Sequence, residues 1–411
     1  MKKISIRLLC LCLAMVQVLC FAGCSPQVAE PTTTGSTTLP TTEATTAATT
    51  QATTEATEEA NYSVLEGSNP IQNIILIIGD GMGQKHIEAG QLYDGKTYDF
   101  TSWPMVKVNT QALDENGELS TDFPDSTAAS TAMATGVLTI NNMVGRDMDG
   151  NDLQTILDVA GAMGKATGIV TNDTLFGGTP AGYSGHASSR NDRMVILESQ
   201  LTSGVNLLCG SAQESVTALA EQIRKSGYAY CEDYGILSST FGSEKAYWQL
   251  PVGNNEATLS LETVTVDALN YLSQDTDGFV LIIEQAHIDK YCHHISFPDI
   301  CQAVSSLNNT VEAVINWLGD RTDTAVLVTA DHETGSLQVS DEAGKYENTV
   351  ELNGNTISYE LRTTNHTTVN VAMYVYGVTA DFTRSDLYKK KALKNTGIYY
   401  LMEEILVAGQ G

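Results

Sequence analysis

Basic residues are scarce in this chain of 411 residues. The sequence has 22 Lys and Arg against 49 Asp and Glu, which gives a formal net charge of -27. Such a surface repels nucleic acid and anionic lipid, and this argues against a role in binding polyanions. A small anionic substrate would need strong local positive charge. Bound metal ions can supply that charge, and surplus carboxylates are one way to hold them.

The sequence also lacks a C-x-x-C pair, so a structural zinc site built from cysteine is not expected. The eight cysteines divide into two groups of four. Those of the first group lie in the N-terminal 24 residues, at Cys10, Cys12, Cys20 and Cys24. Those of the second group lie in the body of the chain, at Cys209, Cys231, Cys292 and Cys301. The second group fits either two disulfides, in one of three connectivities, or four buried thiols.

The apolar run at the N-terminus, Leu8 to Phe21, is too short to span a membrane comfortably and follows three basic residues. This layout is typical of a secretory signal. The run ends in FAGC, which resembles a bacterial lipobox with Phe21 in the usual Leu place. The resemblance implies cleavage before Cys24 and a lipid anchor on that cysteine, as the protein's one link to a membrane. An ordinary signal peptide is the alternative. Both predict export, either to the outer face of the cell membrane or as a secreted protein.

The next segment has too few apolar residues to bury a core. Residues 31–57 are mostly Thr with Ala, Glu and Pro, which predicts a disordered tether over residues 25–68. Residues 69–411 contain no internal repeat and no second low-complexity linker. We therefore predict three parts: a signal peptide over residues 1–24, the tether, and one folded domain over residues 69–411.

Short apolar runs separated by helical patterns predict an α/β fold, a three-layer sandwich whose mostly parallel sheet is flanked by helices. The predicted strands are Asn73 to Gly79, Ala166 to Val170, Phe279 to Ile283 and Thr324 to Thr329. Polar residues follow three of them at once, namely Asp80, Glu284 and the pair Asp331 and His332. Ligands collect at the carboxyl ends of such strands, so these side chains should share one edge of the sheet.

Carboxylates gathered at one edge repel each other and are costly to desolvate, which a shared cation would resolve. Asp289 and His293 are four residues apart, so on a helix they share a face and suit zinc. The chain has only seven histidines. His366 precedes the apolar run from Val369 to Val375, which places it at an edge of the sheet as well.

Six segments, in this order, resemble the alkaline phosphatase family. They are IILIIGDGMG with Asp80, DSTAASTAMATG with Ser126, TPAGYSGHASSR with Arg190, EQAHIDKYCHH with Glu284, Asp289 and His293, VTADHETG with Asp331 and His332, and TTNHTTVNV with His366. The resemblance runs from about residue 73 to about residue 377. It implies the fold predicted above and a metal-dependent phosphomonoesterase.

The resemblance also implies a role for each residue. Ser126 is the nucleophile that becomes phosphorylated, and Arg190 clamps the phosphate. One zinc ion is bound by Asp289, His293 and His366. A second zinc ion, close to Ser126, is bound by Asp80, Asp331 and His332. A magnesium ion is bound by Asp80, Glu284 and Thr179. Lys290, next to a ligand, is considered for a contact with phosphate through water but is not assigned. His186 and His287 are left as structural residues or as supports of the ligands, and His294 as a neighbour of the ligand His293.

The chain departs from the family at the magnesium site. The family usually has Asp or His two residues before the threonine ligand, whereas this chain has Gly177. We therefore expect weaker magnesium binding or a different metal there, with Asp173 as a candidate substitute.

The predicted substrates are small phosphate monoesters. Two zinc ions can clamp the attacking and leaving oxygens, and an arginine fork can bind two phosphate oxygens, which a lysine cannot. Sulfatases, phosphodiesterases and phosphoglycerate mutases resemble this fold, but Asp-Ser followed by small residues favours the monoesterase. A binding lipoprotein without chemistry is a second hypothesis. The sequence names no physiological ester and leaves monomer and homodimer open.

Overall fold

The computed structural model describes residues 70–211, 219–251, 259–378, 382, 388–389 and 392–408, all within the unit Thr53–Gly411. The predicted signal peptide, the tether and residue 69 lie outside the described residues. Within the described part of the chain, no helix combines the length and the apolar character that a membrane span needs.

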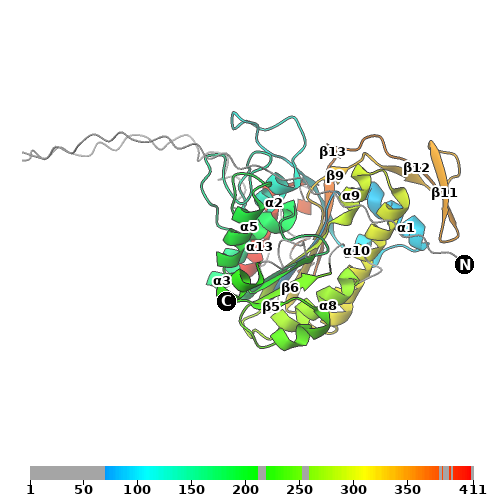
Figure 1. Ribbon diagram of the computed structural model, residues 1–411. Helices are drawn as coiled ribbons and strands as arrows, with labels where there is room; N and C mark the ends of the chain where they lie inside the picture. The colour runs from blue at the N-terminus through cyan, green and yellow to red at the C-terminus, as the bar shows by residue number, and fades with distance from the viewer. Residues whose placement is uncertain are drawn as a thin grey trace, which may run out of the picture. The chain divides into compact units, whose positions relative to one another are not determined.

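A sheet of ten described strands lies at the centre of this unit (Figure 1). Its order is β15 (Ala392–Lys394), β2 (Met105–Asn109), β14 (Val371–Tyr376), β8 (Thr324–Thr329), β1 (Asn73–Gly79), β7 (Phe279–Gln285), β3 (Ala166–Thr171), β4 (Leu207–Ser211), β6 (Ala246–Leu250) and β5 (Ala229–Cys231). Neighbouring strands pair in parallel, except that β14 runs antiparallel to both β2 and β8. The predicted α/β fold with a mostly parallel sheet is thus confirmed.

The central strands form because their sequences are apolar and β-branched without interruption. In β1, NIILIIG, every residue is buried, as expected for a strand covered on both faces. The predicted bounds of β1 and β8 are confirmed. The prediction for β7 stopped two residues early, so Glu284 lies inside the strand rather than after it. The run predicted from Val369 forms β14 only from Val371.

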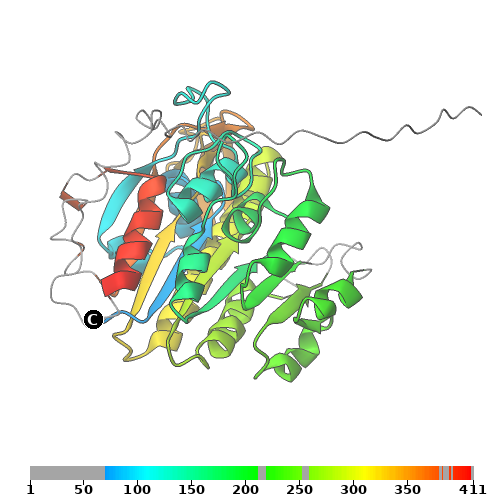
Figure 2. The same ribbon diagram turned by 90° about the vertical axis from the view of Figure 1, so that its left-hand side faces the viewer.

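Helices cover both faces of the sheet (Figures 1 and 2). One layer holds α2 (Ser126–Thr135), α3 (Ile156–Ala162), α4 (Gly178–Ser184), α5 (Arg193–Thr202) and α13 (Thr396–Ala408). The other layer holds α1 (Gln84–Asp94), α8 (Leu261–Leu272), α9 (His287–His293) and α10 (Phe297–Leu318). The peripheral helices are α7 (Ala220–Lys225) and the 3₁₀ helices η1 (Asp99–Ser102) and η2 (Tyr234–Thr240). The predicted three-layer sandwich is confirmed.

Two small antiparallel sheets follow β8. One contains β10 (Gln338–Ser340), β12 (Asn355–Glu360) and β11 (Asn348–Leu352), and the other pairs β13 (His366–Thr367) with β9 (Glu333–Thr334). The reversed direction of β14 matters for the second sheet. Because β14 is antiparallel, its beginning lies at the edge where β1 and β8 end, and His366 just before it reaches the same edge. The expectation that His366 lies at the edge of the sheet is confirmed.

The four body cysteines are all buried free thiols, which decides between the two alternatives left open by the sequence.

Candidate active site

The turns after β1 and β8 bring Asp80, Asp331 and His332 together. The two strands are neighbours, so their carboxyl ends release these side chains side by side. The backbone N–H groups of Gly81 and His332 both donate to Oδ1 of Asp331, at 3.1 and 2.9 Å. Gly81 has φ +73°, and a Cβ there would lie 2.9 Å from Cβ of Asp289. Only glycine fits this close approach without strain.

These three residues form the inner triad. Nε2 of His332 lies 3.2 Å from Oδ2 of Asp331 and 3.6 Å from Oδ1 of Asp80. All three ligand-type atoms lie within 4.8 Å of one another, and all three residues are buried. Oγ of Ser126 is 3.1 Å from the same Nε2. The hydroxyl of the predicted nucleophile therefore faces the inner triad.

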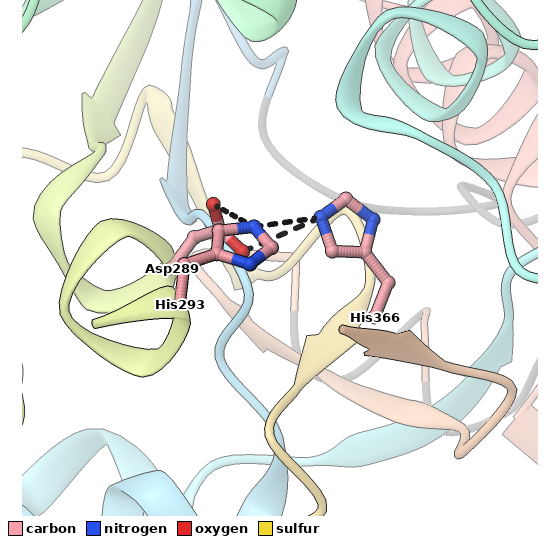
Figure 3. Close-up of side chains that lie close together, drawn as sticks. All are labelled: Asp289, His293 and His366. Carbon is pink, nitrogen blue, oxygen red and sulfur yellow. Dashed lines mark hydrogen bonds and ion pairs between the residues drawn. The ribbon is translucent and has the colours of Figure 1, made fainter. Parts of the chain in front are cut away.

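Asp289, His293 and His366 form the outer triad (Figure 3). Asp289 and His293 lie four residues apart on α9 and share a face of it, as predicted. Nε2 of His293 is 3.1 Å from Oδ2 of Asp289, and Nε2 of His366 is 3.5 Å from Oδ1 of the same carboxylate. The two Nε2 atoms are 3.3 Å apart. One carboxylate and two imidazoles thus converge on a single point.

Backbone carbonyls orient the two outer imidazoles. Nδ1 of His366 donates to the carbonyl of Pro124 at 3.0 Å, and Nδ1 of His293 donates to the carbonyl of Thr364. A carbonyl can only accept a hydrogen bond, so Nδ1 carries the proton in both rings. Nε2 then faces the centre of the triad, as in histidines that bind metal ions.

Thr334 connects the two triads. Its hydroxyl donates to Oδ1 of Asp289 at 2.6 Å and accepts from Nδ1 of His332 at 3.2 Å. The rings of His332 and His366 also stack, with centroids 3.6 Å apart. The inner and outer triads therefore form one continuous centre.

Ser126 is the first residue of α2, and the residue before it fixes the start of the helix. Asp125 is the N-cap and accepts from the N–H of Ala128 at 2.9 Å. The start of α4 packs against this point. A Cβ at Gly178 would lie 2.7 Å from Cβ of Ser126, so glycine is required for the contact. The N-terminus of α2 offers backbone N–H groups and a partial positive charge beside the Ser126 hydroxyl.

Arg190 lies beside the same helix start. Its Nη1 is 3.2 Å from Oδ2 of Asp125, and its backbone N–H donates to the carbonyl of Asn142 at 2.9 Å. The Asn142 N–H donates to Oδ2 of Asp125 as well. Asp125 thus orients the arginine and caps the helix. Because the ion pair uses Nη1, the guanidinium keeps further donors for a phosphate.

The inner triad concentrates negative charge in a dry place. Burial, reinforced by the charges of Asp331, Asp289 and Glu284, raises the pKa of Asp80 well above its usual value. Burial likewise raises the pKa of Asp331 to about 6 and lowers the pKa of His332 to about 4. Oδ1 of Asp80 and Oδ2 of Asp331 are buried and accept no hydrogen bond from the described residues. Two orphaned carboxylate oxygens beside an imidazole nitrogen are a donor set that fits a zinc ion.

In the outer triad, the effects on the pKa of the carboxylate are balanced differently. Burial acts to raise the pKa of Asp289, but the hydrogen bond with His293 and the charges of His332 and His366 outweigh it and hold the pKa below its usual value. The same hydrogen bond raises the pKa of His293. This donor set of two imidazoles and one carboxylate also fits zinc.

Comparison with known proteins gives the chain its family. The model of the alkaline phosphatase family matches residues 71–209 and 249–379. The chain belongs to the alkaline phosphatase family. Alkaline phosphatase 3 of Bacillus subtilis (strain 168) is 29% identical over 289 residues, which cover 66% of this chain and 62% of that protein. Alkaline phosphatase of Escherichia coli (strain K12) is 28% identical over 338 residues, which cover 66% of this chain and 72% of that protein. The match thus spans less than two thirds of the length of the Bacillus relative.

Solved structures show the same fold. Alkaline phosphatase from the Antarctic bacterium TAB5 superposes with a TM-score of 0.70 at 19% identity, over 83% of this chain and 99% of that one. The Thermus thermophilus alkaline phosphatase gives a TM-score of 0.68 at 19% identity, over 88% of this chain and 96% of that one. This chain therefore has the fold of the alkaline phosphatase family.

The carboxylate of Glu284, which the family resemblance assigns to a magnesium site, lies close enough to the inner triad to act on Asp80. Burial raises the pKa of Glu284 to about 7, although Thr171 donates a hydrogen bond to this carboxylate. The buried Thr179 hydroxyl also faces this carboxylate and, like that of Thr171, acts to lower the pKa of Glu284. Gly177 stands at the N-cap of α4 and contributes no side chain.

Asp173 is near this site, although it belongs to neither triad. Its charge contributes to the raised pKa of Glu284, and its Oδ2 forms an ion pair with Nζ of Lys290 at 2.6 Å. Asp173, the candidate substitute ligand from the sequence, is therefore close to Glu284, but its carboxylate already forms an ion pair with Lys290.

Two histidines that were not assigned as ligands lie outside the triads, and two residues of the site had no role assigned from the sequence. His186 and His294 lie outside both triads, with hydrogen bonds to the carbonyls of Leu153 and Lys290. Sequence reasoning assigned no role to Asp125, although an Asp directly before a helix start is a common N-cap signal. No local sequence pattern indicates that Thr334 connects the triads, because its partner Asp289 is 45 residues away in sequence.

Proposed function

We propose that this protein is an alkaline phosphatase that hydrolyses small phosphate monoesters through a phosphoserine on Ser126. The observation that carries the proposal is the position of the Ser126 hydroxyl, 3.1 Å from Nε2 of His332 in a buried triad that is joined to a second triad through Thr334. A nucleophile beside two adjacent cation sites is the arrangement that in-line phosphoryl transfer requires. The metal-dependent activity of the family supports it.

Zinc ions held by the inner and outer triads would act as Lewis acids that stabilise negative charge on the attacking and leaving oxygens. The residues do the rest. Oγ of Ser126 attacks phosphorus as the bond to the leaving oxygen breaks, and the phosphoryl group is transferred to Ser126. Water then attacks the phosphoserine, which releases phosphate and restores the hydroxyl. Arg190 and the N-terminus of α2 bind the phosphoryl oxygens through both steps.

Asp80, Glu284 and Thr179 would hold a third cation, for which magnesium is the candidate. A solved TAB5 alkaline phosphatase mutant carries Mg in its M3 site, which supports a magnesium site in this fold. With Gly177 at the neighbouring position and Asp173 paired to Lys290, Glu284 is the one carboxylate of this site that the inner triad does not share, so magnesium should bind weakly.

Export and lipid attachment at Cys24 belong to the same proposal. The charged and apolar layout of the N-terminus and the FAGC motif support them. A tethered phosphatase outside the membrane would release phosphate from small esters there.

The test is hydrolysis of a chromogenic phosphate monoester by the purified full-length protein at alkaline pH, before and after chelation and zinc addition. Chelation should abolish activity and zinc should restore it. Ser126→Ala should remove activity while zinc stoichiometry and fold stay unchanged, because the hydroxyl is a nucleophile rather than a required ligand. Hydrolysis by zinc-loaded Ser126→Ala at the wild-type rate would exclude the phosphoserine route. No turnover by the zinc-loaded wild type would exclude the phosphatase.

A further inference from the structure

An aromatic ring lies beside the outer triad and has no part in the chemistry described above. The rings of Phe123 and His366 have centroids 5.6 Å apart and planes inclined by 54°. Phe123 is half-buried and precedes Ser126 by three residues. The segment that leads into Ser126 therefore places this ring against the outer triad.

The backbone on both sides of this ring is fixed. The side chain of Asn141 donates to the carbonyl of Phe123 at 3.2 Å and accepts from the N–H of Asp125 at 2.9 Å. Between them, the carbonyl of Pro124 accepts from Nδ1 of His366. These three hydrogen bonds pin the segment from Phe123 to Asp125, so the position of the ring is set by the site itself.

Packing of the core does not explain the ring. Phe123 belongs to neither of the two hydrophobic clusters of the described residues, and it is not among the partly buried side chains that pack against them. A phenyl ring that stays partly exposed beside the imidazole of His366 is available to contact an apolar ligand.

The direction of the reaction places the leaving group on this side. In-line attack by Ser126 puts the leaving oxygen opposite the serine hydroxyl. Ser126 faces the inner triad, so the leaving group departs towards the outer triad, which contains His366. The alcohol part of the ester would then extend past His366, whose ring contacts that of Phe123.

We propose that Phe123 is a specificity-determining residue that favours phosphate esters with an aromatic leaving group by ring contact. The inference rests on the proposed phosphatase function. Aromatic pairs prefer offset or edge-to-face arrangements, and the inclined ring of Phe123 can form either with a planar leaving group. An inorganic phosphate ion, which lacks that part, does not reach the ring.

The experiment compares kcat/KM for phenyl phosphate and ethyl phosphate in the zinc-loaded full-length protein and in two variants. Phe123→Ala should lower kcat/KM for phenyl phosphate by about 2–10-fold, which is the range for one aromatic contact, and should leave ethyl phosphate within about twofold. Phe123→Tyr keeps the ring and is the matched control. Its ratio between the two esters should stay that of the wild type.

Inhibition by phosphonates gives a second measurement that does not depend on turnover of the ester tested. Phe123→Ala should weaken inhibition by phenylphosphonate but not by methylphosphonate or inorganic phosphate, with unchanged zinc stoichiometry. Equal losses for both esters, together with lost zinc, would mean that the ring only supports His366 and would overturn the inference. So would an unchanged ratio of the two esters in Phe123→Ala. Failure of the wild type to hydrolyse either ester would instead refute the proposed function.

Discussion

The two triads contain the same kinds of side chain, Asp and His, but are built differently. The inner triad comes from the ends of two central strands, and the side chains of Asp331 and His332 are fully buried. The outer triad comes from a short helix and a two-residue strand, and the side chain of His293 is 38% exposed. The difference suggests a division of labour. Under the proposed mechanism, the buried triad would give the Ser126 hydroxyl a fixed, dry environment, and the outer triad, where His293 is exposed, would face the leaving group and solvent.

The largest effect should come from removing one imidazole from each triad in turn. His332→Ala should lower kcat by about 10³-fold or more, as expected for loss of a group that stabilises the transition state, and excess zinc should not rescue it. His293→Ala should cost about 10–100-fold at limiting zinc and should recover with excess zinc, because solvent reaches the position. Activity and bound zinc, measured across a zinc titration, check both. Equal rescue of the two variants would abolish the distinction between the triads.

In the chelated protein, the carboxyl of Asp331 should contribute a loss of stability as pH rises, which the lowered pKa of His332 opposes. The pKa of Asp331 is raised from 3.8 to about 6, so its folded state favours the protonated form. The stability gained from that proton is present below pH 4 and is lost as pH rises through 6. Burial raises the pKa of Glu284 in the same direction, from 4.5 to about 7.

Asp331→Asn should therefore reduce the loss of unfolding free energy between pH 4 and 8 by about 1–3 kcal/mol. Urea unfolding of the chelated protein at several pH values measures it. Asp289→Asn is the control: the pKa of Asp289 lies below its usual value, so the same change in the outer triad should not flatten the profile. A flattening of equal size in both variants would contradict the contrast.

The smallest effect concerns the hydroxyl that joins the triads. Thr334→Val keeps the shape of the side chain but removes the donor to Asp289 and the acceptor for His332. Zinc affinity should fall about tenfold, in the range for hydrogen-bond partners of metal ligands. Thr334→Ser should retain most of the affinity. Competition with a chromogenic chelator measures both variants, and a wild-type affinity in Thr334→Val would show that the triads are independent.

Much of this centre was predictable because its residues follow buried strands. Asp80, Asp331 and His332 stand directly after continuous apolar runs, and parallel strands bring such positions to one edge. The pairing of Asp289 with His293 was also predictable, because residues four apart share one face of a helix. Glu284 was assigned correctly to the edge but not to the strand, because hydrophobicity alone cannot mark where a strand ends when its last residues are polar and buried.

Contacts between distant segments could not be predicted in this way. Nothing in the local sequence pairs Asp173 with Lys290, or Phe123 with His366. The strand direction of β14 was also not predicted. An apolar run shows that a strand forms, but its direction depends on the connection that leads into it and on the neighbours with which it pairs.

That direction has a consequence for how the protein is made. The strand β14 turns back so that the segment before it returns to the start of α2, where His366 bonds to the carbonyl of Pro124 across 242 residues of sequence. During synthesis, the residues of the inner triad are therefore complete at His332, before the outer triad is completed at His366. Any chain that stops short of His366 lacks both an outer ligand and the clamp on the nucleophile segment. Premature termination between residues 333 and 365 would thus yield a protein that has the strands up to β8 and the residues of the inner triad but lacks His366.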